Sequence, residues 1–210
     1  MGNIKIVNNL GKDVQVEVND REITIAWAKA NRKLSDLKTG DVFKDGNETE
    51  YIICEHFDNG TTAVVKKDLL ETDMKFGTTN DWKDSDIREH LNGGYLKELK
   101  VWFGGENIVE FERDLTSLDG YDDYGKCQDK ASVMSIIEYM KYHKYIGNCD
   151  RRYCLLTPDS TPSGRQSTPL YCGSDYVENV LSYGDICYSF HSDFVAVRPF
   201  FILKSNIFVF

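Results

Sequence analysis

Apolar and polar residues alternate through the first stretch of the chain, and this two-residue period most constrains the fold. Side chains of a β-strand point alternately to its two faces, so the alternation predicts strands with one buried face. Turn residues such as Asn8-Asn9 and Asn19-Asp20 separate the alternating runs. Residues 3–27 are therefore expected to form three short antiparallel strands, within a small N-terminal β-extension spanning 1–33. The apolar positions are Ile4 and Ile6, then Val14, Val16 and Val18, then Ile23, Ile25 and Trp27.

A second β-rich stretch follows a polar connector at about Asn31–Leu37. The dipeptides Asp45-Gly46 and Asn59-Gly60 are strong hairpin signals, because tight hairpin turns need residues that accept positive φ angles. These dipeptides separate three runs of apolar residues. The runs predict strands at Val42-Phe43, Tyr51–Cys54 and Thr62–Val65.

The middle of the chain changes to a helical period. Ile87, Leu91 and Tyr95 recur every four residues and, with Trp82, predict one apolar stripe. Ser85 is the expected N-cap of this helix, and Gly93-Gly94 is the expected stop, with a further turn or helix after it.

A second helix is predicted by Ser135 and Glu138, which have the spacing of a capping box. It should run from about Ser135 to Tyr142. After Gly147 the sequence indicates loops and strands, with the apolar segment FVAVRPFFIL returning to the core. Helices that lie between two β-rich parts predict one α+β domain, which we place at 34–210. Its central strands should contain Val197, Phe200 or Phe201, and Ile202.

Charge and hydropathy argue against two classes of function. The chain has 210 residues and a net charge of −9, whereas a nucleic-acid-binding protein needs a basic surface. Its apolar runs fall short of the ~20 residues that a membrane-spanning helix requires. The first residues, MGNIKIVNN, lack the pattern of a signal peptide. We expect synthesis in a bacterial cytoplasm, with a phage particle or a cell surface as alternative final locations.

Motifs for catalysis are not found in the sequence. It contains no phosphate-binding loop, dinucleotide fingerprint or GxSxG. Two cysteines have a histidine nearby, but no third group that would orient a catalytic pair is identifiable. These pairs are Cys54 with His56 and Cys187 with His191. We therefore expect a binding protein rather than an enzyme, with no catalytic residues and no cofactor.

Metal sites and disulfides are not expected either. The six cysteines contain no C-x-x-C pair, and without an export signal reduced thiols are expected. The segment DGYDDYG at 119–125 is rich in carboxylates but lacks the spacing of an EF-hand loop. We interpret it as a turn, with a calcium loop as the alternative.

Six motifs that occur in order resemble one family. The chain from about Leu34 to Val209 is similar to bacterial and phage domains grouped as domain-of-unknown-function family 6273. The motif that reads RRYCLLTP here departs from the Trp-rich pattern of that family, and Ala196 replaces its usual Gly. The motifs are LSDLKTGDVF, DWKDSDIREHLNGGYLKEL, DLTSLDGYDDYG, SVMSIIEYMKYHKYI, LLTPDSTPSG and VAVRPFFILKSNIFV.

The resemblance implies a C-type-lectin-like fold, which formylglycine-generating enzymes and the variable proteins of diversity-generating retroelements share. Such folds place ligand contacts on a C-terminal surface of loops and strands. Lys, Glu, Gln, Met and Trp make up 40 of the 210 residues, yet Glu178 is the only one of them among the 28 residues from Ser167 to Phe194. An AAY codon randomised at its adenines encodes none of these five types. An ordinary loop rich in Tyr, Ser and Gly would look similar.

Tyr, Ser, Asn and Gly are typical of binding surfaces, because Tyr offers a large rigid contact area and the small residues adapt. Alternation in ICYSFHSDF should expose about half of its side chains if it is a strand. Arg198 and Pro199 are expected to fix the end of a core strand. The candidate ligand contacts are Tyr171, Ser174, Asp175, Tyr176, Asn179, Tyr183, Asp185, Tyr188, Phe190, His191 and Asp193.

These observations favour a ligand- or receptor-binding protein, encoded by a phage or prophage and diversified by a retroelement. Its expected partner is a protein or glycan on a cell surface, and homo-oligomerisation stays open. One alternative is an oxidase of the formylglycine-generating type that uses Cys172 and Cys187. The other is a structural virion or assembly subunit in which Met1–Ala30 is the docking arm.

Overall fold

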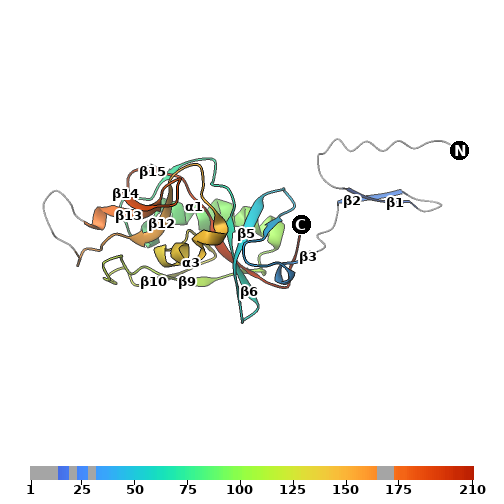
Figure 1. Ribbon diagram of the computed structural model, residues 1–210, viewed down its shortest axis with the longest axis horizontal. Coiled ribbons are helices and arrows are strands. Elements are labelled where there is room, and N and C mark those ends of the chain that lie inside the picture. The colour runs from blue at the N-terminus through green and yellow to red at the C-terminus, as the bar shows by residue number, and fades with distance from the viewer. Residues whose placement is uncertain (1–13, 19–22, 28–31, 165–172) are drawn as a thin grey trace.

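The computed structural model describes residues 14–18, 23–27, 32–164 and 173–210, and it shows a mixed α+β architecture (Figure 1). Strands β1 (Val14–Val18) and β2 (Ile23–Trp27) pair antiparallel, with Val14 opposite Trp27. Two of the three expected N-terminal strands are thereby confirmed. The third, around Ile4 and Ile6, lies outside the described residues.

The largest sheet contains the strands expected between Val42 and Val65. Its strand order is β11-β16-β6-β5-β4, and β8 also pairs with β16. All of these pairs are antiparallel. The strands are β4 (Val42–Lys44), β5 (Glu50–Phe57), β6 (Thr61–Lys66), β8 (Ile108–Val109), β11 (Ala131–Ser132) and β16 (Phe200–Lys204).

Helix α1 (Asp86–His90) begins as the sequence predicts but does not end there. The Ser85 hydroxyl accepts a hydrogen bond from the backbone N–H of Arg88, after the 3₁₀ turn η2 (Trp82–Asp84). The predicted stop at Gly93-Gly94 is wrong. The chain continues through a π-helical turn, η3 (Leu91–Tyr95), into α2 (Leu96–Phe103). Burial of Leu96, Leu99 and Phe103 extends the apolar stripe, and this packing outweighs the low helix propensity of glycine.

Helix α3 (Ile136–Ile146) has the predicted capping box, because Ser135 and Glu138 exchange both hydrogen bonds. It extends four residues beyond the predicted end at Tyr142. Tyr142 and Ile146 are both buried, so the apolar stripe continues to the last turn. The helix stops at Gly147, whose φ of 61° is a conformation that favours glycine.

Shorter pairs and one three-stranded sheet complete the fold. The order in the three-stranded sheet is β12-β13-β14. Strand β3 pairs with β17, so pairing with the C-terminal strand already begins at Arg32, two residues before the expected start of the domain. The remaining pairs are β9 with β10 and β7 with β15. The bounds are β3 (Arg32–Lys33), η1 (Leu34–Asp36), β7 (Met74–Lys75), β9 (Phe111–Asp114), β10 (Lys126–Asp129), β12 (Tyr153–Pro158), η4 (Gly173–Asp175), β13 (Tyr176–Val180), β14 (Ile186–Phe190), β15 (Phe194–Val195) and β17 (Phe208–Val209).

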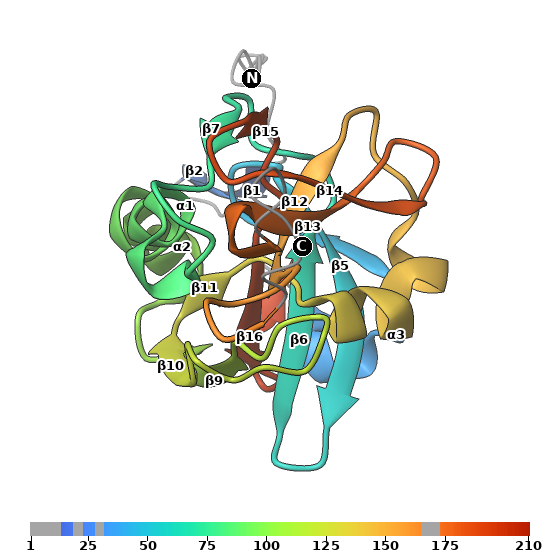
Figure 2. The ribbon, with the colours of Figure 1, turned by 90° about the vertical axis from the view of Figure 1, so that its left-hand side faces the viewer.

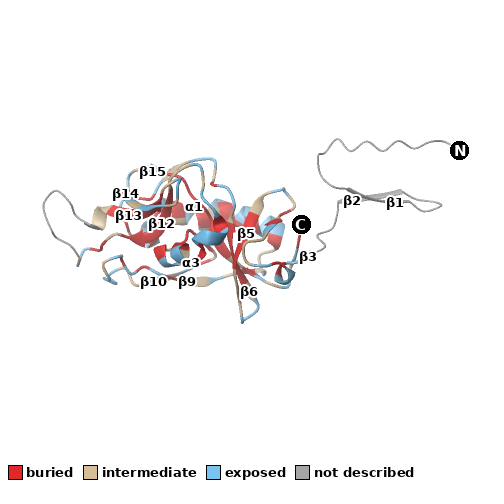
Figure 3. Cartoon of the chain, in the orientation of Figure 1, coloured by how far each residue is buried: buried red, intermediate tan, exposed pale blue. Residues whose placement is uncertain are grey.

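Strand β16 lies between two apolar layers. Phe201 packs edge to face against Tyr51, with ring centroids 5.6 Å apart, in the layer that contains α2. Its neighbour Phe200 stacks on Tyr142 in the layer that contains α3. Figure 2 shows α1 and α2 on one side of the central strands and α3 on the other. Buried residues are concentrated where these layers meet (Figure 3). Successive residues of a strand face opposite sides, which explains why FF in this strand supports both layers.

Arg198 fixes the chain before β16, as expected. It is fully buried, and its guanidinium donates to four backbone carbonyls at 2.8–3.1 Å. These carbonyls lie at the ends of β6 and α3, and they belong to Lys66, Lys67, Ile146 and Gly147. A charged group whose donors are used in this way has a structural role.

Candidate binding face on strands β13 and β14

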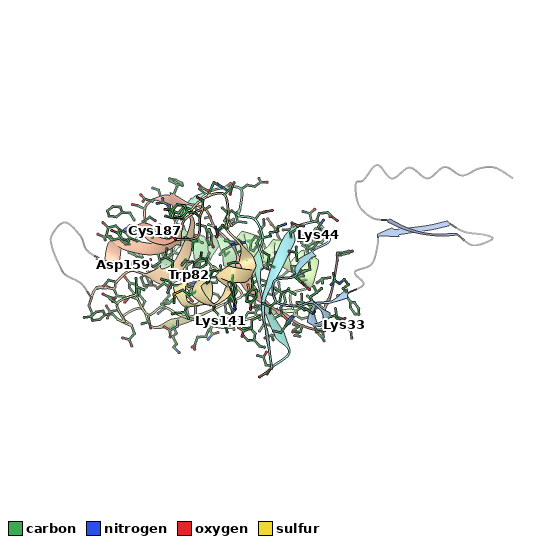
Figure 4. All side chains as sticks on the ribbon, viewed as in Figure 1. Lys33, Lys44, Trp82, Lys141, Asp159 and Cys187 are labelled. Carbon is green, nitrogen blue, oxygen red and sulfur yellow. The ribbon has the colours of Figure 1, made fainter. Side chains whose placement is uncertain are left out.

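The register of β13 and β14 brings three pairs of side chains to one face of the three-stranded sheet. Tyr176 lies opposite Phe190, Glu178 opposite Tyr188, and Val180 opposite Ile186. Directly opposed residues of an antiparallel pair point to the same side. In the described part of the chain β14 pairs only with β13, so it is an edge strand of this sheet. Figure 4 labels Cys187, which belongs to β14, and Asp159, which directly follows β12.

Large apolar side chains are exposed along β14 and just beyond it. The exposed fraction is 62% for Tyr188 and 46% for Phe190. The ring of Tyr176, which is only 7% exposed, packs against the rings of both residues. Its ring centroid lies 5.1 Å from that of Tyr188, at 80°, and 4.4 Å from that of Phe190. The other exposed members of this group are Tyr183, Ile186 and Phe194.

The opposite face of β13 is buried. Asn179 has no exposed surface, and its amide donates to the Val177 carbonyl at 2.8 Å and to the Ser189 hydroxyl at 2.9 Å. Among the predicted contacts, Asn179 therefore belongs to the interior, and Tyr176 supports the exposed rings. Every residue of β13 is buried because it is the central strand of this sheet, and alternation alone does not give this.

The other predicted contacts lie in the turns around the sheet. Tyr183 and Asp185 are exposed in the β13–β14 turn, while Ser174, Asp175 and Asp193 are half-buried. The ring of His191 is also half-buried, and its Nδ1 lies 3.0 Å from the Gly77 carbonyl oxygen. The structure thus brings most of the predicted residues to one end of the molecule. Tyr171 lies outside the described residues.

Glu178 is the unexpected member of this face. It is 2% exposed, and its Oε1 has no hydrogen-bond partner in the described structure. Burial, and then the nearby charge of Asp159, raise the pKa of Glu178 to about 7. Sequence reasoning noticed this residue only as a compositional exception, and it overlooked Asp159, Ile186 and Phe194 as neighbours of the face. The sequence signal for Glu178 is its position between Tyr176 and Val180, because alternate residues of a strand share one face, and an acidic residue between two apolar ones on that face is unusual.

The cysteines offer little support for nucleophilic chemistry. Cys54, Cys127, Cys149, Cys154 and Cys187 are free thiols, and Cys172 lies outside the described residues. Burial raises the pKa of each of these five thiols, which favours the unreactive protonated form. The Cys172–Cys187 pair of the oxidase alternative stays untested.

Acidic residues near Asp119 form turns, as interpreted from the sequence. The Gly120 N–H donates to the Ser117 carbonyl, and the Gly125 N–H to the Asp122 carbonyl. Asp119 accepts from the hydroxyls of Ser117 and Ser160. Among the described residues, no group of three or more His, Cys, Asp or Glu side chains is arranged to hold a metal ion.

A cavity of about 570 Å³ lies away from this face, between β9 and the N-terminus of α3. Arg113 and Glu138 meet in its wall through two hydrogen bonds of 2.7 and 2.6 Å. The Arg113 guanidinium also lies 5.0 Å from the ring centroid of Phe111. Because the Arg113 guanidinium and the Glu138 carboxylate are paired with each other, we interpret this corner as structural.

No protein-family model matches the sequence, and comparisons with curated proteins and with solved structures give no match either. None of the described helices has the length and apolar character needed to cross a membrane.

Proposed function

We propose that this protein binds a ligand or receptor through the β13–β14 face. The observation that carries the proposal is the row of exposed apolar side chains on β14, with Tyr183 and Phe194 beside it. Monomeric soluble proteins rarely expose contiguous apolar surface, and aromatic side chains dominate the energy of binding interfaces. The face is built on paired strands, so its backbone is ordered before a partner arrives.

The scaffold we propose is C-type-lectin-like, as the resemblance to family 6273 implies. A protein or glycan on a cell surface is the proposed partner. The composition of Ser167–Phe194 supports diversification by a retroelement in a phage or bacterial genome, and an adjacent reverse-transcriptase gene would test this point. The β1–β2 extension is proposed to dock the domain onto a larger assembly or onto another copy.

The test is a variant in which Tyr183, Tyr188 and Phe190 are replaced together with Ser. Binding of the wild type and the variant would be measured on glycan arrays and on intact bacterial cells. Because these side chains are exposed, the variant should fold and melt within a few degrees of the wild type. It should lose binding, because each aromatic anchor contributes about 2 kcal/mol or more.

A matched control replaces three exposed apolar residues elsewhere, Val101, Tyr145 and Phe208, with Ser. This control should bind like the wild type. Equal loss of binding in both variants, or unfolding of the first, would show that the β13–β14 face is not the binding surface.

A further inference from the structure

Glu178 carries information about the ligand, because a buried carboxylate without a partner is unusual. Unpaired polar groups in the interior lower the stability of the fold, and each one in a native structure calls for an explanation. In the described part of the chain no ion pair includes Glu178. Its Oε1 accepts no hydrogen bond there. The missing partner is therefore a hydrogen-bond donor, preferably a positively charged one.

The rings around Glu178 suit a cation. Tyr188 lies directly opposite Glu178, and Tyr176 precedes it by two residues on the same face. Tyr176 and Tyr188 are nearly perpendicular, at 80°, and Phe190 lies beside them. The face of an aromatic ring attracts a cation within about 6 Å of its centroid. Lys75 already makes such a contact at the margin of this face, with its Nζ 5.4 Å from the centroid of the Phe194 ring.

The charge of one neighbouring residue, Asp159, adds to this preference for a cationic ligand. Asp159 follows β12, and its backbone N–H donates to the Tyr176 carbonyl, so its negative charge acts on Glu178 from the neighbouring strand. A ligand cation would be attracted to the Glu178 carboxylate, whereas an anionic ligand would be repelled by it.

We propose that the β13–β14 face binds an N–H-bearing cation, the ammonium of Lys or the guanidinium of Arg on a protein segment, against Glu178 and the rings of Tyr188 and Phe190. This inference rests on the proposed binding function and adds its ligand class. A protein segment is the favoured source, because β14 is an edge strand whose backbone can pair with an extended segment. Because Glu178 is only 2% exposed, a neighbouring side chain must move for the cation to reach it, and the exposed Tyr188 opposite it is the one we propose, since surface side chains rotate rapidly.

The experiment uses three peptides, Val-Lys-Val-Thr, Val-Arg-Val-Thr and Val-Gln-Val-Thr, and the full chain. Affinity would be measured by NMR titration, with the signals of the β14 residues as reporters. The Lys and Arg peptides should bind roughly tenfold or more tightly than the Gln peptide, because they alone supply a charged donor. Glu178→Gln should remove this preference. Glu110→Gln, the same change at an exposed residue, should retain it.

The outcomes separate this inference from the proposed function. If Glu178→Gln keeps the preference for Lys and Arg, the cation inference is wrong even where the triple aromatic variant loses binding to cells. Glu178-dependent binding of amino-sugar glycans without binding of the peptides would overturn the protein source. Equal binding of trimethyllysine and Lys peptides would overturn the requirement for an N–H donor. Thermal melts of Glu178→Gln would exclude loss of folding as the cause.

Discussion

Two glutamates, the half-buried Glu138 and the buried Glu178, show how differently the same side chain is used in two parts of this molecule. Glu138 lies at the N-terminus of α3, where its carboxylate accepts two hydrogen bonds from Arg113 and one from the Ser135 N–H. Although burial alone would raise its pKa, the charge and hydrogen bonds of Arg113 and the bond from Ser135 lower the pKa of Glu138. Within the described ranges Glu178 has no such partner, and burial raises its pKa to about 7.

This difference separates a structural carboxylate from a candidate functional one. The Glu138 contacts join α3 to β9 and occupy both carboxylate oxygens. Glu178 instead shares a sheet face with exposed aromatic side chains, at a buried position where a neutral side chain would stabilise the fold. A residue that lowers stability and faces an exposed apolar surface is more readily explained by binding than by folding. Three variants test this comparison.

Arg113→Ala should have the largest effect, because it leaves the Glu138 carboxylate without its partner. Arg113 is buried and Glu138 is half-buried, so the loss should approach the roughly 3–5 kcal/mol expected for a fully buried ion pair. Urea denaturation would measure the change in the free energy of unfolding. Lys126→Ala is the control, since its ion pair with Glu112 is exposed to solvent, and it should leave stability almost unchanged. Similar effects of the two variants would contradict the structural role given to Glu138.

Much of the fold could be predicted from the sequence, because its signals are local. The hairpin dipeptides gave β4, β5 and β6, and the Ser135–Glu138 spacing gave the start of α3. The stop at Gly93-Gly94 failed because burial of side chains beyond it, which is a tertiary effect, decides whether the helix continues.

The site could be predicted only in part. Alternation gave the exposed positions of β14, since Tyr188 and Phe190 are exposed while Ser189 between them is buried. It could not give the burial of Tyr176 and Asn179, which depends on how β13 packs between its neighbours. Glu178 was overlooked because a lone Glu in a polar stretch is typical of a solvated surface.

The pH dependence of stability should have opposite signs at the two glutamates. The pKa of Glu178 is about 7 in the folded chain and 4.5 for an ordinary Glu. Between these pH values the folded chain holds a proton that the unfolded chain has lost, so the free energy of unfolding falls as pH rises. The loss is at most about 3 kcal/mol, from 1.36 kcal/mol per pKa unit. Glu138, whose pKa is lowered, contributes stability above its unfolded pKa and loses it as pH falls through its folded pKa.

The measurement is a set of urea denaturations of the wild type and Glu178→Gln between pH 4 and pH 8. The difference between the two proteins isolates Glu178, because the other titrating groups are shared. Apart from Asp159 and Cys187, whose charges interact with Glu178, these groups should cancel. Relative to the wild type, Glu178→Gln should gain stability as pH rises toward 7. Parallel curves would show that Glu178 is ionised in the folded chain and has a partner.

The smallest effect is expected from Tyr188→Ser, the replacement of the ring that lies opposite Glu178. The side chain is 62% exposed, so its removal should change the free energy of unfolding by about 0.5 kcal/mol or less. Tyr176→Ser is the control within the same sheet, and it should cost several kcal/mol because that ring is buried beneath Tyr188 and Phe190. Loss of Tyr188 should also expose Glu178 to water and bring its pKa closer to 4.5. Urea denaturation of Tyr188→Ser between pH 4 and pH 8 would detect this change as a weaker dependence of stability on pH. If Tyr188→Ser instead destabilised the chain as much as Tyr176→Ser, the β14 ring would be part of the core. The contrast between Glu138 as a structural residue and Glu178 as a functional residue would then lose its basis.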